Sequence, residues 1–134
     1  WRSAREDLDV ALLVTDDAAA GPLIGLEVAP TIPPVRDGAY VYVIGHPGGG
    51  GLQLSIRGND LLDEDGVRLR YKAPTAKGSS GSPVFDEAWR LIGIHHKGGT
   101  DLPALRGGAG TVAANEGITV HAVQERLRNE PPEV

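Results

Sequence analysis

The stretch Gly78-Ser79-Ser80-Gly81-Ser82-Pro83 decides how this chain is interpreted. Its glycines, serines and closing proline suit neither the interior of a helix nor that of a strand, and they are typical of a tight loop. Apolar residues follow at Val84-Phe85 and, beyond a short polar turn, at Leu91-Ile92-Gly93-Ile94, so we expect strands to hold the loop. Acyl-transfer chemistry needs an exposed serine hydroxyl beside backbone N–H groups that can face an oxyanion. The alternative is a Ser/Gly-rich surface turn without chemistry.

Composition limits the fold and the classes of partner. The 134 residues correspond to one ordinary domain, and 19 glycines with 10 prolines predict many turns and short strands rather than a helix bundle. The net charge of −5 disfavours nucleic acid and membranes as partners. The chain has no cysteine, so it forms no disulfide and no thiolate metal site. The lack of cysteine and of a visible signal peptide favours a cytoplasmic over a secreted location, although the chain begins at Trp1 and is expected to be a fragment.

The pattern of apolar residues predicts an all-β fold with one terminal helix. Residues 16–38 are rich in Ala, Pro, Gly and Asp and predict an extended connector, and residues 98–110 predict a loop. A helix is expected at residues 121–129, ended by Pro131-Pro132. Strands are expected within residues 9–14, 39–44, 52–58, 61–62, 67–71, 83–85, 90–95 and 112–120. Such a set forms an antiparallel barrel or a sandwich, and a sandwich without any site fits it equally well.

Three segments resemble one protein family. The run from Gly78 to Phe85, followed by Leu91-Ile92-Gly93-Ile94-His95, resembles the nucleophile region of trypsin/chymotrypsin-fold serine peptidases. It is most similar to the disulfide-free bacterial glutamyl-endopeptidase branch and to related intracellular bacterial trypsin-like domains. Asp9-Val10-Ala11-Leu12-Leu13 resembles the strand that carries the aspartate of the catalytic triad, and Gly45-His46-Pro47 resembles a loop near the start of the second barrel.

This resemblance implies an architecture for the chain. We expect an antiparallel six-stranded trypsin-like β-barrel with a short C-terminal helix, preceded by one strand of a missing first barrel. Residues 1–20 would then be the last strand of the first barrel, residues 21–38 the connector between barrels, and residues 39–134 the second barrel with its helix.

The resemblance also implies the catalytic residues. Ser80 would be the nucleophile, the N–H groups of Gly78 and Ser80 would form the oxyanion hole, and Asp9 would orient a general-base histidine. The family's order along the chain is His, Asp, Ser, but no histidine precedes Asp9 here. We therefore expect an N-terminal half of the same peptidase domain to supply the base. The chain alone should turn over peptides poorly, because a serine hydroxyl without a base is a weak nucleophile.

A specificity pocket is implied by the same resemblance. In the glutamyl-endopeptidase branch, a histidine at the place of His95 and a hydroxyl at the place of Thr75 bind the acidic side chain of the substrate. A histidine can carry positive charge and a hydroxyl can donate a hydrogen bond, so together they favour a carboxylate. Alternation along the strand predicts that His96 faces the opposite side. The structural alternative is that His95 and Thr75 only satisfy local hydrogen bonds.

These features favour a serine endopeptidase that acts on protein or peptide substrates, with a preference for acidic residues and without a cofactor or metal. The adjacent histidines at 95 and 96 face opposite ways and no nearby carboxylate completes a metal site. The competing class is a catalytically inactive peptide-binding or regulatory module of the same fold. An α/β-hydrolase esterase is disfavoured, because its nucleophile lies in G-x-S-x-G and its aspartate follows the serine.

Overall fold

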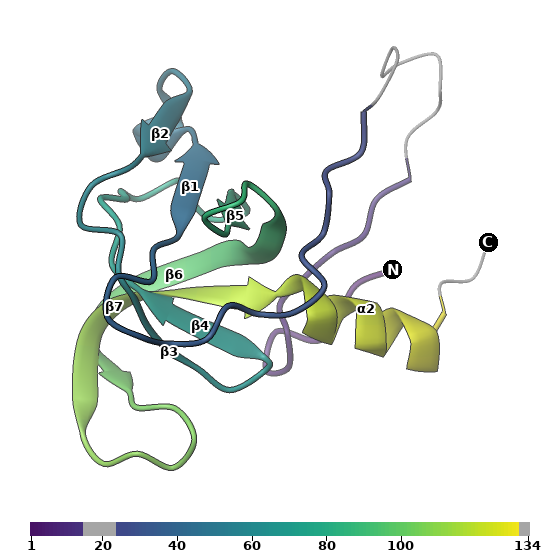
Figure 1. Ribbon diagram of the computed structural model, residues 1–134. Coiled ribbons are helices and arrows are strands. Elements are labelled where there is room, and N and C mark those ends of the chain that lie inside the picture. Colours follow the sequence, from purple (N-terminus) through teal and green to yellow (C-terminus); the bar gives the residue numbers. More distant parts are fainter. Residues whose placement is uncertain (15–23, 132–134) are drawn as a thin grey trace.

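An antiparallel sheet and a C-terminal helix form the regular secondary structure of the described residues (Figure 1). The computed structural model describes residues 1–14 and 24–131. Its seven-stranded sheet has the order β2-β1-β5-β6-β7-β4-β3. The elements are β1 (Tyr42–Gly45), a 3₁₀ turn (Pro47–Gly49), β2 (Gln53–Ser55), β3 (Leu61–Glu64), β4 (Arg68–Tyr71), β5 (Pro83–Phe85), β6 (Leu91–Pro103), β7 (Thr111–Thr119) and α2 (Val120–Asn129). The predicted mostly β fold with a short C-terminal helix is confirmed.

The two ends of the sheet meet, so the sheet closes into a barrel. The backbone N–H of Val41 donates to Asn59 O at 2.9 Å, and that of Leu61 donates to Ala39 O at 2.8 Å. The segment that leads into β1 therefore bonds to the start of β3, while β1 itself pairs with β2. Buried Asn59 fixes the bend between β2 and β3 through its side chain, which donates to Val41 O at 2.8 Å. This bend separates β2 from β3, so the closed sheet has seven strands in place of the six predicted.

The interior of the barrel is apolar and follows the alternation of the strands. Val41 and Val43 are buried, whereas the alternating residues Tyr40 and Tyr42 lie on the outer side. Each such side chain stabilises the fold by about 1.5–3 kcal/mol when fully buried. The core cluster consists of Ala29, Ala39, Val41, Val43, Leu61, Leu69, Tyr71, Val84 and Ile92.

Two strands extend beyond the barrel as a long arm. The predicted loop from Gly98 to Gly110 is wrong in its first half, because β6 continues to Pro103. Gly98 pairs with Asn115 and Leu102 pairs with Val112 on β7. Glycine weakens a strand on its own, but here β6 pairs with β7 on both sides of an irregularity between Gly99 and Leu102, and that pairing outweighs the local preference.

The N-terminal segment is not the predicted buried strand. Within residues 9–14 the only bridge joins Ala11 to Arg2, and Val14 is 94% exposed. A strand needs a neighbour to which its backbone can bond. Among the described residues, the backbone of this segment bonds only to residues 1–4, as in the 2.9 Å bond from Ser3 N to Val10 O, and it forms an irregular hairpin. Residues 15–20, which were assigned with it, lie outside the described residues.

Contacts with α2 hold this hairpin against the barrel. Arg126 of α2 forms a 2.6 Å ion pair with Asp7, next to the buried Leu8, and Figure 1 shows the purple segment passing α2. The helix begins after Thr119, whose hydroxyl accepts a hydrogen bond from Ala122 N at 3.1 Å. Of the predicted connector, residues 24–38 are described and contain no helix or strand. In the described part of the chain, no helix has the length and apolar character needed to cross a membrane.

Candidate active site

The serine loop lies between β4 and β5 and is bonded firmly to β6. Gly81 N donates to His95 O at 2.8 Å, and His95 N donates to Ser82 O at 2.8 Å. Within the loop, Ser82 N donates to Ser79 O at 3.1 Å. Gly78 and Gly81 have φ angles of 96° and 87°, a region that glycine adopts without steric cost. The predicted tight turn is therefore present and rigidly held.

Only one of the three serines of the loop is exposed. Ser79 and Ser82 are buried, and Ser79 Oγ accepts a bond from Ala76 N at 3.3 Å. Ser82 packs against Gly45, where an added Cβ would collide with Ser82 Oγ. The Ser80 hydroxyl is exposed and donates to the backbone O of His96 at 3.0 Å. Ser80 is thus the serine that a substrate can reach.

The two amides predicted to bind an oxyanion are available. The N–H groups of Ser79, Gly81 and Ser82 donate within the protein, whereas those of Gly78 and Ser80 donate to no group among residues 1–14 and 24–131. The turn at residues 47–49 supports this loop, because Gly48 N donates to Lys77 O at 2.7 Å. An added Cβ on Gly78 would come within 3.3 Å of Gly48 N. The backbone therefore leaves both amides free at a site where only glycine fits easily.

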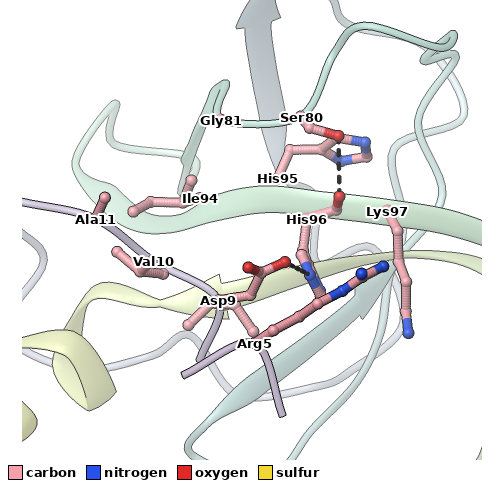
Figure 2. A pocket seen from close by; sticks show the side chains of 11 residues that line it. Arg5, Asp9, Val10, Ala11, Ser80, Gly81, Ile94, His95, His96 and Lys97 are labelled. Atoms are coloured by element: carbon pink, nitrogen blue, oxygen red, sulfur yellow. Dashed lines mark hydrogen bonds and ion pairs between the residues drawn. The ribbon is translucent and has the colours of Figure 1, made fainter. Parts of the chain in front are cut away.

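Asp9 lies on the opposite side of β6 from His95 and contacts His96. Asp9 Oδ2 is 3.1 Å from His96 Nε2, and His96 Nδ1 is 2.9 Å from Glu116 Oε1 (Figure 2). Carboxylate oxygens only accept, so both bonds form only when each ring nitrogen carries a proton. Asp9 itself has a φ of 53°, and its Oδ1 has no hydrogen-bond partner in the described part of the chain. One carboxylate oxygen is held by His96 and the other is free.

Glu116 on β7 keeps His96 in place. Its side chain is buried and forms ion pairs with Arg70, with Lys97 at 3.7 Å and with Arg68 at 3.9 Å. Burial alone would raise the pKa of Glu116, but the hydrogen bonds from His96 and Arg70 and the positive charge of Arg70 outweigh burial and lower it. Glu116 is therefore a stable anion opposite His96.

His95 faces the other way, toward Ser80 (Figure 2). It is 4% exposed, and its Nδ1 lies 2.6 Å from the hydroxyl of Tyr71 on β4. Burial, and then the neighbouring charge of His96, lower the pKa of His95 below its ordinary value. Burial, and then the negative charge of Glu116, raise the pKa of Tyr71. The tyrosine therefore keeps its proton, and the neutral form of His95 is favoured.

Two cavities meet at Ser80. One of about 390 Å³ is lined by the predicted pocket residues Thr75 and His95, with Gly78, Lys77 and Lys97. In it, the Thr75 hydroxyl donates to Asn115 Oδ1 at 2.9 Å. The other, of about 630 Å³, is lined by Ser80 together with Asp9, Arg5 and His96. All five site residues predicted from the sequence, Asp9, Thr75, Gly78, Ser80 and His95, therefore border one of these two adjoining cavities.

No imidazole among the described residues accepts the Ser80 hydroxyl. His46 is exposed and its Nδ1 lies 2.9 Å from Gly50 O, while His121 is on α2. Tyr71, His96 and Glu116 are site residues that the sequence did not reveal as such. Alternation places His96 opposite His95, but no sequence signal identifies the two carboxylates that His96 joins.

Comparisons with known proteins identify the fold and the family of the chain. The chain is 35% identical over 77 residues to the uncharacterized protein y4fB of Sinorhizobium fredii (strain NBRC 101917 / NGR234); the match covers 52% of this chain and 12% of that relative. The crystal structure of Rv3671c from M. tuberculosis H37Rv, an inactive serine-to-alanine mutant, matches with a TM-score of 0.56 and 21% identity over 84% of this chain and 58% of that one. That likeness shows the trypsin-like fold, and the glutamyl-endopeptidase branch stays a prediction. Because residues 2–94 match the family model of the trypsin-like peptidase domain, the chain belongs to that family.

Proposed function

We propose that this chain is part of a serine endopeptidase that forms an acyl-enzyme on Ser80. One observation supports this most strongly: Ser80 and Asp9, far apart in the sequence, border the same cavity of about 630 Å³. Ser80 presents a hydroxyl whose one protein partner among the described residues is a backbone oxygen, and Asp9 presents a free Oδ1. An imidazole placed between these two groups would complete a catalytic triad.

The reaction that we propose follows from these groups. The imidazole donates from one nitrogen to Asp9 and takes the Ser80 proton with the other as Oγ bonds to the peptide carbonyl carbon. The resulting oxyanion accepts hydrogen bonds from the N–H groups of Gly78 and Ser80, each worth about 3 kcal/mol in such sites. The imidazolium then protonates the leaving amine as the C–N bond breaks, and water hydrolyses the ester on Ser80.

The base itself is proposed to come from outside this chain. An N-terminal half of the peptidase domain would carry the histidine and dock on the cavity beside Asp9. In this proposal residues 1–20 belong with that first barrel, residues 21–38 connect the barrels, and residues 39–134 form the second barrel. The exposed apolar side chains Leu13, Val14 and Ile24 support such docking, because they are 82%, 94% and 94% exposed.

The substrate preference that we propose is for an acidic residue on the amino side of the cleaved bond. The smaller cavity beside Ser80 contains His95 and the lysines Lys77 and Lys97. No carboxylate among the described residues lines it, so an incoming carboxylate meets donors and positive charge there.

Cleavage of peptides by the full-length protein tests the function. Peptides that differ only in the residue before the cleaved bond are compared by mass spectrometry of the products. We expect cleavage after Glu or Asp, abolished by Ser80→Ala and retained by Ser82→Ala, the matched control in the same loop. Cleavage that survives Ser80→Ala would show that another group carries the reaction.

The second candidate is an inactive peptide-binding module of the same fold. It is favoured because no imidazole in the described part of the chain accepts a hydrogen bond from the Ser80 hydroxyl. It predicts that the full-length protein binds peptides in the cavity beside Ser80 but yields no products, and that Ser80→Ala changes neither result.

A further inference from the structure

The pocket histidine has one nitrogen occupied and one open. His95 Nδ1 lies 2.6 Å from the Tyr71 hydroxyl. His95 Nε2 has no protein partner among the described residues, and it is not among the enclosed, unpaired atoms, which are Arg70 Nε and His121 Nδ1. Because His95 lines both cavities beside Ser80, its Nε2 lies at the cavity surface. A ligand side chain in the pocket would therefore meet Nε2.

The structure is built so that Tyr71 can reach this histidine across a strand. Tyr71 is on β4 and His95 is on β6, with β7 between them. Gly117 of β7 pairs with both Leu69 of β4 and His95 of β6. An added Cβ on Gly117 would lie 3.2 Å from Tyr71 Cε1 and 3.7 Å from its hydroxyl. Glycine at this position thus leaves room for the tyrosine ring to lie over β7.

The proton positions follow from the partners. Tyr71 is fully buried, and its hydroxyl has His95 as its only protein partner in the described residues. A buried hydroxyl donates where an acceptor is offered, so the Tyr71 proton points at His95 Nδ1. The ring proton of neutral His95 then sits on Nε2 and points into the pocket. A second ring proton would have to displace the Tyr71 proton from the 2.6 Å contact.

The charged groups around His95 also favour its neutral form. His96 and Lys97 on β6 and Lys77 in the serine loop lie on or near its pocket and disfavour a further positive charge, as does Arg5. The carboxyl groups of Glu116 on β7 and of Asp9 are directed to His96 on the opposite side of β6. His95 itself is buried beneath the pocket surface, and burial disfavours its charged form.

We propose that Tyr71 holds His95 as the neutral tautomer protonated on Nε2, so that the pocket recognises a side-chain oxygen by a hydrogen bond and accepts glutamine as well as glutamate. The proposal rests on the proposed peptidase function and refines its substrate class. A neutral donor bonds an amide oxygen and a carboxylate oxygen alike, whereas an imidazolium would strongly favour the carboxylate. A leucine of similar size would leave the Nε2 proton without a partner and be rejected.

The tautomer is measured directly by ¹⁵N NMR of the histidine rings in this 134-residue chain. We expect His95 at pH 7.5 to show a protonated Nε2 and an unprotonated Nδ1, and its Nε2 signal to shift on addition of acetylated peptides that end in Gln or in Glu, but not in Leu. Tyr71→Phe should abolish the fixed pattern, and Tyr42→Phe, the matched control on β1, should keep it. Protonation of both ring nitrogens, or of Nδ1 alone, would overturn the proposal.

Cleavage by the full-length protein tests the specificity separately. We expect kcat/KM for Gln and Glu peptides to agree within about tenfold and that for Leu peptides to be at least about 100-fold lower. Tyr71→Phe should raise the Glu-to-Gln ratio by about tenfold or more, because Nδ1 is then free to take a second proton. A Glu-to-Gln ratio above 100 in the unsubstituted protein would contradict the proposal. The 134-residue chain could bind the Gln and Glu peptides with the predicted His95 tautomer while the full-length protein cleaves no peptide. That result would refute the peptidase function and leave the proposed recognition by His95 intact.

Discussion

His95 and His96 are neighbours on β6, yet the two faces of the strand give them opposite tasks. His95 is buried against the hydroxyl of Tyr71 and faces the pocket beside Ser80. His96 lies between the carboxylates of Asp9 and Glu116. A hydroxyl partner suits a neutral ring, whereas two carboxylates suit a ring that carries both protons. The chemistry of the partner, and not the residue type, therefore distinguishes His95, which we propose to recognise substrate, from His96, which we propose to hold the carboxylate of the triad.

The largest effect is expected on the His96 side, where Asp9 lies. Asp9→Asn in the full-length peptidase should lower kcat by about 10³–10⁴-fold, because an amide cannot stabilise the imidazolium that forms in the reaction. Steady-state kinetics on a cleaved peptide measures it. Asp7→Asn, which removes the partner of Arg126, serves as the control, and its kcat should stay within about threefold of that of the unsubstituted protein. A loss below tenfold for Asp9→Asn would remove Asp9 from the triad.

His96→Gln sharpens the contrast between the two histidines. Glutamine can bond one carboxylate but not both, and a lost bond of this kind costs about 1–3 kcal/mol. We expect kcat to fall roughly 10- to 100-fold while KM changes little, because Asp9 loses its orientation and the pocket is on the other face. A change in KM with an unaltered kcat would place His96 in substrate binding instead.

The next largest effect is expected in the pH dependence of stability, which reports on the buried ring of His95. The pKa of His95 is lowered in the folded state from an ordinary value of 6.5, so below pH 6.5 the unfolded chain binds more protons than the folded one. The free energy of unfolding should therefore fall as the pH falls from 6.5 through the folded pKa. Urea unfolding of the 134-residue chain at several pH values measures this slope. His95→Gln should flatten it, and an unchanged slope would contradict the neutral, buried state of His95.

The smallest effect is expected from the ion pair between Asp7 of the N-terminal hairpin and Arg126 of α2. Asp7 and Arg126 are each about one-third exposed, at 34% and 35%, and such pairs contribute about 0–1 kcal/mol. Arg126→Ala should lower the free energy of unfolding by less than about 1 kcal/mol in urea and leave kcat nearly unchanged. A loss of kcat as large as that of His96→Gln would mean that α2, rather than His96, positions Asp9.

The sequence predicts the parts of this site that depend on local chemistry. Glycines suited to a tight loop and strand alternation at residues 95–96 follow from residue type and spacing, whereas the choice of Ser80 among the three serines rests on the family resemblance. The length of β6 beyond Gly98 does not, because it depends on pairing with β7. The irregular hairpin at residues 1–12 could not be predicted for the same reason. The apolar residues at 10–14 indicate a strand whether or not a partner strand is present. Tyr71 and Glu116 reach the histidines through the register of three strands, which no short motif encodes.

The account depends above all on Ser80 being a reactive nucleophile, and covalent labelling tests this most directly. The full-length protein is treated with a fluorophosphonate, digested, and the adduct is located by mass spectrometry among Ser79, Ser80 and Ser82. We predict a single adduct on Ser80, lost in Ser80→Ala and formed far more slowly in Asp9→Asn. No adduct in the loop, or equal labelling of its three serines, would contradict the account.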